Sequence, residues 1–570
     1  MKANKYLLKA LVVVYSLVGL CSCEGFLDRE PKSTIPPELY FNTADQLEAN
    51  LNDEYPNILP SYGQWTYGIF GEDTDTDNQI GVNANDRYTS DRWKVPYSEG
   101  SNWKFERIYR VNFFLSETLP KFGEDISGSQ NTIFGDVPTI KHYIGEMYFL
   151  RAYEYFKKLM LFGDFPIIEK PLTDDKSTLI EASKRYPRNE VARFILSDLD
   201  KASEYMSEVD MATTRINKDL AELLKSRVAL FEASWLLNFK GTAFVPGGED
   251  WPGASLYPNY QYPSGSIDKE IEFFLNQAVE SSKLVAEKYK SSLTENTGVL
   301  QQSADAPSNP YYDMFASEDL SSVKEVLLWR QYARGLVTHN INAAASRGNY
   351  RVGLTRGLVQ NFLMLDGSPV YTHGSYADGD GYYMGDKTIS DVRANRDPRL
   401  SIFLKEPGQK NILFELDNIE GTEAVITEPY PAITSGDGER GYATGYALRK
   451  GGSFNRKHYA NGGGYTGQVY FRAAEALLNY MEASYLLNGS LDASAREYWT
   501  IIRKRAGIST DFDKTISLTD MQKEAENDWG AYTAGNILQD KTLYNIRRER
   551  RCEFMAEGLR YMDLRRWRSM

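Results

Sequence analysis

The chain has 570 residues, of which 42% are hydrophobic and 25% are charged, a balance that is ordinary for a globular protein with a substantial core. Its formal net charge of −13 at pH 7 disfavours nucleic acid as a partner, because binding to phosphates requires clustered cations. The 3 cysteines exclude a disulfide-based scaffold, whereas 39 Tyr and 9 Trp are a surplus that indicates aromatic side chains on a contact surface.

The N-terminus has the layout of a bacterial export signal. Lys2 and Lys5 precede an uncharged run over residues 10–22, which has the length of a signal-peptide apolar segment and is too short to span a bilayer comfortably. The run ends in "LCSC", a lipobox pattern with a small serine before the second cysteine. We therefore predict that residues 1–22 are a signal peptide and that Cys23 is the lipidated residue of the mature protein.

A metal site at Cys21 and Cys23 is the alternative interpretation of this pair. A closed zinc site needs four ligands, and the first histidine of the chain is His142, so the ligand set is incomplete. We expect residues 23–37 to be a lipidated tether and residues 38–570 to form a single domain.

Helices are predicted for most of that domain. In residues 141–166 an apolar stripe at three-to-four spacing faces away from a charged side, and Gly163 and Pro166 end the helix. The stripe consists of Ile144, Tyr148, Ala152, Tyr155 and Leu159, and the charged side of Glu146, Glu154, Lys157 and Lys158. Residues 469–507 resemble a tetratricopeptide unit of two helices. The predicted helical scaffold comprises about residues 38–59, 104–239, 267–291 and 469–570.

The segments between these helices are rich in Gly, Pro and aromatic residues and lack a sustained period, so we predict long loops with short strands. They comprise about residues 60–103, 240–266 and 292–468. Their rings can stack on the apolar face of a sugar, and packing of each ring onto the scaffold is the alternative. The candidate ligand-binding residues are Trp65, Tyr67, Trp93, Tyr97, Trp251, Tyr257, Tyr260, Tyr262, Tyr311 and Tyr312.

Seven stretches, in order, resemble the SusD/RagB family of outer-membrane lipoproteins from glycan-foraging bacteria. They are "CEGFLDREP", "YFLRAYEYFKKLMLFGDFP", "RINKDLAELLKSRVAL", "FLMLDGSPV" followed by "RDPRL", "VYFRAAEALLNYMEA", "IIRKRAGI" and "RRERRCEFMAEGLRYMDLRRW". Their order and spacing cover essentially the whole chain. Members of the family usually continue beyond the "RRW" element, so truncation after Met570 is left open.

The resemblance implies a mainly α fold, in which a tetratricopeptide-like helical scaffold carries ligand-binding loops. It also implies a lipoprotein exposed on the outer membrane that captures oligosaccharide, or sometimes peptide, for a TonB-dependent, SusC-like transporter. The four histidines are scattered and no nucleophile or metalloprotease motif is present. A glycosidase needs only two carboxylates, and the 78 acids always offer candidate pairs, so it is the resemblance that implies no catalytic residues. The sequence is also compatible with a surface glycoside hydrolase and with a purely structural lid.

Three further motifs are weighed against simpler interpretations. "GGGYTG", residues 462–467, matches a dinucleotide fingerprint ahead of a predicted helix, but no strand ends before it, so no cofactor is expected.

"EDTDTDN", residues 72–78, lacks the glycine and glutamate of an EF-hand; Asp73, Asp75 and Asp77 are weak calcium candidates in an otherwise solvated acidic loop. The arginine-rich residues 547–551 alternate with acids, which favours ion pairing within the scaffold over a nucleic-acid patch.

Overall fold

The computed structural model describes residues 40–83, 102–206, 209–416 and 426–570. The predicted signal peptide, Cys23, the tether, Trp93 and Tyr97 lie outside these residues. Within the described ranges, no helix combines the length and the apolar character needed to cross a membrane.

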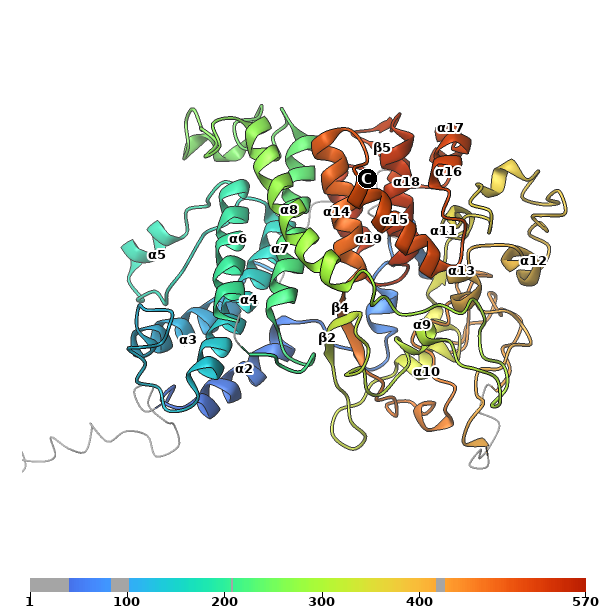
Figure 1. Cartoon of the computed structure of the whole chain (residues 1–570), viewed down its shortest axis with the longest axis horizontal. Coiled ribbons are helices and arrows are strands. Elements are labelled where there is room, and N and C mark those ends of the chain that lie inside the picture. The colour runs from blue at the N-terminus through green and yellow to red at the C-terminus, as the bar shows by residue number, and fades with distance from the viewer. Residues whose placement is uncertain (1–39, 84–101, 207–208, 417–425) are drawn as a thin grey trace, which may run out of the picture.

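A series of helices, most of them long, runs across the molecule and forms its scaffold (Figure 1). They are α2 (Ala44–Ile58), α3 (Glu106–Phe122), α4 (Val137–Phe162), α5 (Lys176–Ala182), α6 (Arg188–Tyr205), α7 (Lys218–Phe239), α8 (Ile267–Tyr289), α14 (Ala474–Asn488), α15 (Ala493–Ala506), α18 (Lys541–Glu553) and α19 (Arg560–Arg566). Helix α4 packs against α2, α3 and α6, and α7 packs against α6 and α8. Because α14 packs against α7, α8, α15 and α18, the C-terminal helices extend the same scaffold. The predicted mainly α fold class is confirmed.

Helix α4 shows how local sequence and packing act together. Asp136 caps its first turn by accepting a hydrogen bond of 3.0 Å from the Thr139 N–H, and Gly163 ends it with a φ of 67°. The predicted apolar stripe is buried. The charged side is largely buried as well, because neighbouring segments supply partners: the Glu146 carboxylate lies 2.7 Å from Nη2 of Arg215, in the connection between α6 and α7. The helix is therefore covered on more sides than its stripe predicts.

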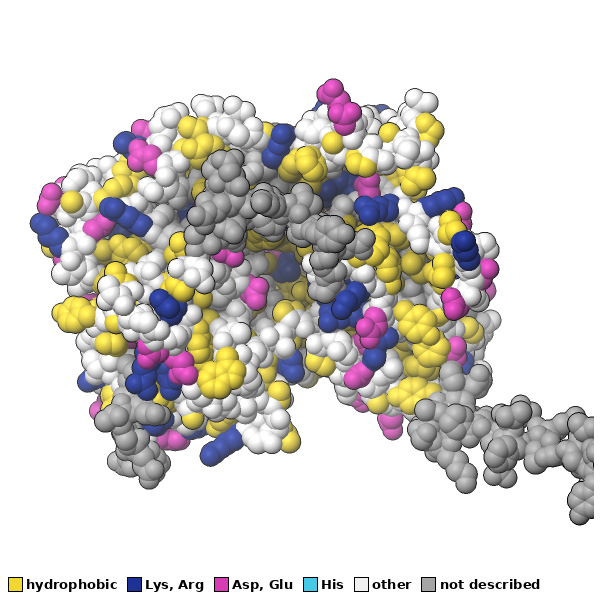
Figure 2. All heavy atoms as spheres, turned by 180° about the vertical axis from the view of Figure 1, so that it is seen from behind, with side chains coloured by type: hydrophobic (Ala, Val, Ile, Leu, Met, Phe, Trp, Pro, Cys, Tyr) yellow, Lys and Arg dark blue, Asp and Glu magenta, His cyan; other side chains and the backbone are white. Residues whose placement is uncertain are grey.

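Loops, short helices and short strands make up the rest of the described chain, and these pack around a core of their own. The short helices are α9 (Pro310–Asp313), α10 (Ile341–Ala345), α11 (Arg356–Asn361), α12 (Ile389–Arg393), α13 (Pro398–Phe403), α16 (Phe512–Leu518) and α17 (Met521–Ala525). The strands pair antiparallel as β1 (Gln79–Ile80) with β3 (Gly353–Leu354), β2 (Val326–Arg330) with β4 (Gln468–Arg472), and β5 (Tyr532–Thr533) with β6 (Asn536–Ile537). Seen from behind, the molecule is hollowed in the middle, and charged side chains of both signs lie around the hollow (Figure 2).

Strand β4 corrects one predicted boundary. The helix expected to begin at residue 469 begins at Ala474, because Gln468–Arg472 pairs with β2. The "GGGYTG" motif therefore precedes a strand and not a helix, which removes the structural context of a dinucleotide fingerprint.

A buried ion network joins the scaffold to the loops. Burial alone raises the pKa of the Glu553 carboxyl, but Arg505, Arg472 and Arg399 outweigh it and hold that pKa well below its usual range. The arginines of residues 547–551 are at most 3% exposed. One of them, Arg550, places Nε 2.8 Å from the Asp563 carboxylate. The predicted ion pairing within the scaffold is confirmed.

Candidate ligand-binding site

A cavity of about 300 Å³ lies at the seam between the helical scaffold and the loops, which is a volume at the lower end of that of small-molecule sites. We call it the seam cavity. It is lined by the loop after α2, by α4 and α7, by β4 with the start of α14, and by the turn after α18. The residues are Pro60, Ser61, Ile69, Glu72, Tyr153, Arg227, Gln468, Val469, Tyr470, Phe471, Arg472, Glu475, Phe554, Glu557, Gly558 and Leu559.

Both arginines of the seam cavity are held between a carboxylate and an aromatic ring. Arg227 places Nε 2.7 Å from Oε1 of Glu475, and its guanidinium lies 4.5 Å from the centre of the Phe471 ring. Arg472 places Nε 2.9 Å from Oε2 of Glu557 and lies 4.4 Å from the centre of a second ring, Phe554. The cations are therefore neutralised inside the wall and kept in fixed positions.

Gln468 presents an unused hydrogen-bond donor in this wall. Its side chain is 1% exposed, and Oε1 accepts bonds from the Tyr62 N–H (2.9 Å) and the Tyr332 hydroxyl (3.2 Å). Its Nε2 has no partner among the described residues. An unpaired buried donor costs on the order of 1–3 kcal/mol.

The rim and the walls supply complementary groups. Partial burial raises the pKa of Glu72, and the base of its side chain lies close to the turn at Gly558: a Cβ at Gly558 would be 3.2 Å from Cβ of Glu72. Tyr153 and Tyr470 are half-buried and present rings with hydroxyls. Flat rings beside hydrogen-bonding groups of both kinds fit a small polar ligand that has an apolar face.

Trp65 lies on the same loop as the cavity residues Pro60 and Ser61. Its indole is 62% exposed, and its backbone has a φ of 59°, which is rare for a bulky residue. The loop is held by Gln64, whose Nε2 donates a bond of 2.9 Å to the Thr338 carbonyl. Of the predicted aromatic candidates that are described, Trp65 is the ring most available to a ligand.

Four of the other candidates are buried, and the prediction that they contact a ligand is corrected to the packing alternative. Tyr67, Trp251, Tyr311 and Tyr312 are 2%, 4%, 1% and 2% exposed. The hydroxyls of Tyr67 and Tyr312 donate bonds of 2.6 Å to the carbonyls of Lys450 and Gly452. These rings fasten the loops to one another.

The loop of residues 247–266 brings Trp251, Tyr257, Tyr260 and Tyr262 together, as their grouping in the sequence predicts. Trp251 donates from Nε1 to Oδ2 of Asp164 over 2.8 Å, so it clips the loop to the end of α4 instead of offering a free face. The three tyrosines are half-buried around it.

The calcium prediction for Asp73, Asp75 and Asp77 is wrong. The Asp73 carboxylate is fully buried and accepts bonds from Asn78 (3.0 Å) and from the Ala556 N–H (3.1 Å). Asp77 lies 2.7 Å from Arg560, whereas Asp75 is exposed. No cluster of three metal-ligating side chains occurs within the described ranges. The acidic loop ties the chain to its C-terminal helices.

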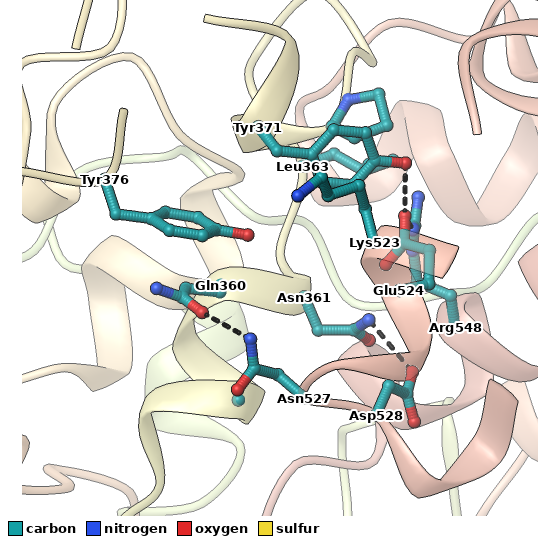
Figure 3. A pocket seen from close by; sticks show the side chains of 12 residues that line it. Gln360, Asn361, Leu363, Tyr371, Tyr376, Lys523, Glu524, Asn527, Asp528 and Arg548 are labelled. Carbon is teal, nitrogen blue, oxygen red and sulfur yellow. Dashed lines mark hydrogen bonds and ion pairs between the residues drawn. The ribbon is translucent and has the colours of Figure 1, made fainter. Parts of the chain in front are cut away.

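A second, smaller pocket lies between α11 and α17 (Figure 3). Tyr371 donates to Glu524 (2.9 Å), Asn361 to Asp528 (3.0 Å), and a third bond joins Asn527 to Gln360. Its volume of about 10 Å³ is room for one water. We interpret this pocket as a hydrogen-bonded junction and not as a ligand site.

The sequence alone does not mark Gln468, Tyr470, Tyr153 and Glu72 as residues of the seam cavity. The first two lie next to or within a stretch predicted to be a helix, and Tyr153 belongs to a helix whose predicted role is packing. The only signal was indirect: "VYFR" is part of one of the stretches that resemble the family.

Comparison with known proteins agrees with this architecture. A family model described as "SusD family" matches residues 303–570, and one described as "Starch-binding associating with outer membrane" matches residues 25–230. The chain belongs to the SusD/RagB family. Among SusD-like proteins of Formosa agariphila, P2 is 26% identical over 267 residues, covering 45% of this chain and 49% of that protein. P25 is 24% identical over 285 residues, covering 47% and 51%. The matched region thus spans about half the length of these relatives.

Solved SusD-like structures share the fold. One from Bacteroides fragilis NCTC 9343 superimposes with a TM-score of 0.61 at 21% identity, covering 95% of this chain and 89% of that one. A SusD-like carbohydrate binding protein from the same strain has a TM-score of 0.59 at 18% identity and covers 92% and 86%. At such identities the likeness establishes the fold alone.

Proposed function

We propose that this SusD/RagB chain is a non-enzymatic glycan-binding protein, and that the seam cavity with the Trp65 loop receives the oligosaccharide. The single observation that carries the proposal is the seam cavity of about 300 Å³, whose wall combines aromatic rings with arginines held by acids of the same wall. A sugar ring offers an apolar face to the rings and hydroxyls to the polar groups between them.

The family supports the wider role. One matching family model is described as starch-binding and associated with the outer membrane, and a structural neighbour is described as carbohydrate binding. We propose that Cys23 anchors the mature chain, with residues 23–37 as tether and residues 38–570 as one domain. From the outer membrane, it would deliver glycan to a SusC-like, TonB-dependent transporter.

Calorimetric titration with a panel of oligosaccharides tests the binding. The first variant is Glu72→Ala, because this carboxylate lines the seam cavity while its side chain is exposed. We expect it to weaken binding at least tenfold without lowering the melting temperature. Tyr153→Ala should weaken binding as well, but it also removes packing against Phe471, at 6.2 Å between ring centres. Its affinity therefore needs a parallel thermal melt.

Glu181→Ala is the matched control. Glu181 lies on α5, and its carboxylate is exposed and paired with Lys184, two residues past the end of that helix. This variant should bind as the wild type does. Equal affinity of Glu72→Ala and Glu181→Ala would place the glycan elsewhere. Binding of peptides in preference to glycans would favour the peptide-capturing alternative, and release of reducing ends from a polysaccharide would favour a glycoside hydrolase.

Metabolic labelling with a fatty acid tests the proposed anchor. The wild type should carry label and partition with membranes, whereas Cys23→Ala should do neither. Label that persists in Cys23→Ala would contradict lipidation at this residue.

A further inference from the structure

One acid of the seam cavity is left without a cation. The charged residues that line the cavity are Arg227, Arg472, Glu72, Glu475 and Glu557. Arg227 binds Glu475 through Nε over 2.7 Å. Arg472 binds Glu557 through Nε over 2.9 Å and through Nη2 over 2.8 Å. Each cation of the wall is thus matched by an acid of the same wall, and Glu72 is the acid that remains.

The paired arginines have no charge to spare for a ligand. The guanidinium of Arg472 also lies 2.9 Å from Glu325, behind the Glu557 pair. Arg227 uses both Nε and Nη2 on Glu475, over 2.7 Å and 2.5 Å. An acidic sugar would therefore meet cations that already have carboxylate partners, together with the negative charge of Glu72.

Glu72 is open to a ligand. It lines the cavity, and its side chain is exposed. Partial burial raises the pKa of its carboxyl, and no charge or hydrogen bond from the described residues offsets that shift. The wall of the cavity therefore includes a negative charge for which the described part of the chain provides no partner.

We propose that the seam cavity selects a glycan that carries an ammonium group, such as an amino sugar with a free amine, and that Glu72 binds this ammonium. The inference rests on the proposed glycan binding and names its substrate class. The sugar ring lies against the half-buried rings of Tyr153 and Tyr470 while its ammonium faces Glu72. Lys157 lies 5.5 Å from the centre of the Tyr153 ring but pairs with Glu154, so it leaves Glu72 to the ligand.

Calorimetric titration with a matched pair of ligands tests the inference. The pair is a trimer of glucosamine and the same trimer N-acetylated on every ring, at a pH at which the free amines are protonated. The wild type should bind the amine form about tenfold more tightly, on the scale of a hydrogen bond to a charged group. Added salt should reduce this preference, because the charge of an exposed carboxylate is screened.

Glu72→Gln is the decisive variant, because it removes the charge and keeps the size of the side chain. It should bring the affinity ratio of the two trimers close to one without lowering the melting temperature. Glu181→Gln makes the same change on the exposed acid of α5 and should keep the tenfold ratio. A ratio that is unchanged in Glu72→Gln would show that the acetyl groups act through their bulk, and would overturn the inference.

Two further outcomes separate this inference from the proposed function. Equal binding of both trimers by the wild type, weakened equally by Tyr153→Ala, would overturn the ammonium preference and leave the glycan site standing. Binding of trilysine and of neither trimer would overturn the proposed glycan function and the amino sugar with it. Loss of trilysine binding in Glu72→Gln would then assign the ammonium site to a peptide.

Discussion

The seam cavity and a hollow of about 500 Å³ beside Trp251, which we call the Trp251 groove, are built from the same kinds of residue but differ in where the partners of their arginines lie. In the seam cavity, Arg227 and Arg472 each have a carboxylate among the lining residues themselves. In the Trp251 groove, Arg188 pairs with Glu232, which is not a lining residue. The comparison teaches that aromatic rings alone do not define a ligand site, because the partners of the cations decide which charges a ligand meets.

The largest effect is expected where a lining residue also belongs to the buried ion network. Arg472→Met would leave Glu553 and Glu557 without this cation, and breaking a buried pair costs about 3–5 kcal/mol in unfolding free energy. Arg188→Met, on the groove side, leaves only Glu232 and should cost less. Chemical denaturation measures both values. Arg496→Met is the control: it removes the exposed ion pair with Asp513 and should cost less than about 1 kcal/mol of unfolding free energy. Equal losses of unfolding free energy in all three variants would contradict the expected difference between the two regions.

The scaffold side of both sites could be predicted from the sequence. The period of α4 and the glycine that ends it are local signals, so its helix and its end at Gly163 follow from neighbouring residues. Burial of its charged side does not follow, because Arg215, the partner of Glu146, lies 69 residues away in the chain.

The site residues could not be predicted because their roles depend on distant partners. Gln468 belongs to β4 only through pairing with β2, and its free donor depends on Tyr62, 406 residues away, occupying the acceptor oxygen. Composition makes Trp251 a reasonable stacking surface for a ligand. Its indole instead donates a hydrogen bond to Asp164, 87 residues away, and so holds the loop in place. Composition therefore located aromatic loops without telling exposed rings from buried ones.

A smaller effect, specific to the seam cavity, is expected on acidification. His339 packs against Tyr62 and Tyr332, with ring centres 4.8 Å and 4.7 Å away, and both tyrosines bind Gln468. Burial lowers the pKa of His339 from 6.5 to about 4, and its Nδ1 already accepts the Ile341 N–H, so it has no room for a second proton.

The folded-state pKa of His339 lies below its unfolded value, so the neutral form stabilises the fold. That contribution is complete above pH 6.5 and is lost as the pH falls towards 4. We expect a loss of about 2 kcal/mol by pH 5, together with weaker glycan binding. His339→Gln, which does not titrate, should show a flatter stability curve over this interval. Glycan binding that stays constant down to pH 5 while the unfolding free energy falls would show that His339 does not act on the seam cavity.

The smallest change in stability, and the sharpest test of the cavity side, concerns Trp65. A bulky residue at a φ of 59° is strained by on the order of 1–2 kcal/mol, and strain of this kind gathers at functional positions. Trp65→Gly relieves the strain at some cost in chain entropy, so its unfolding free energy should stay equal or rise by up to about 1 kcal/mol. Trp65→Ala keeps the strain and loses the same ring. Both variants should weaken glycan binding by about 1–3 kcal/mol, on the scale of aromatic stacking. Calorimetry paired with denaturation separates these effects: if both variants bind glycan as the wild type does, the exposed indole takes no part in capture and the strain at Trp65 serves only the loop.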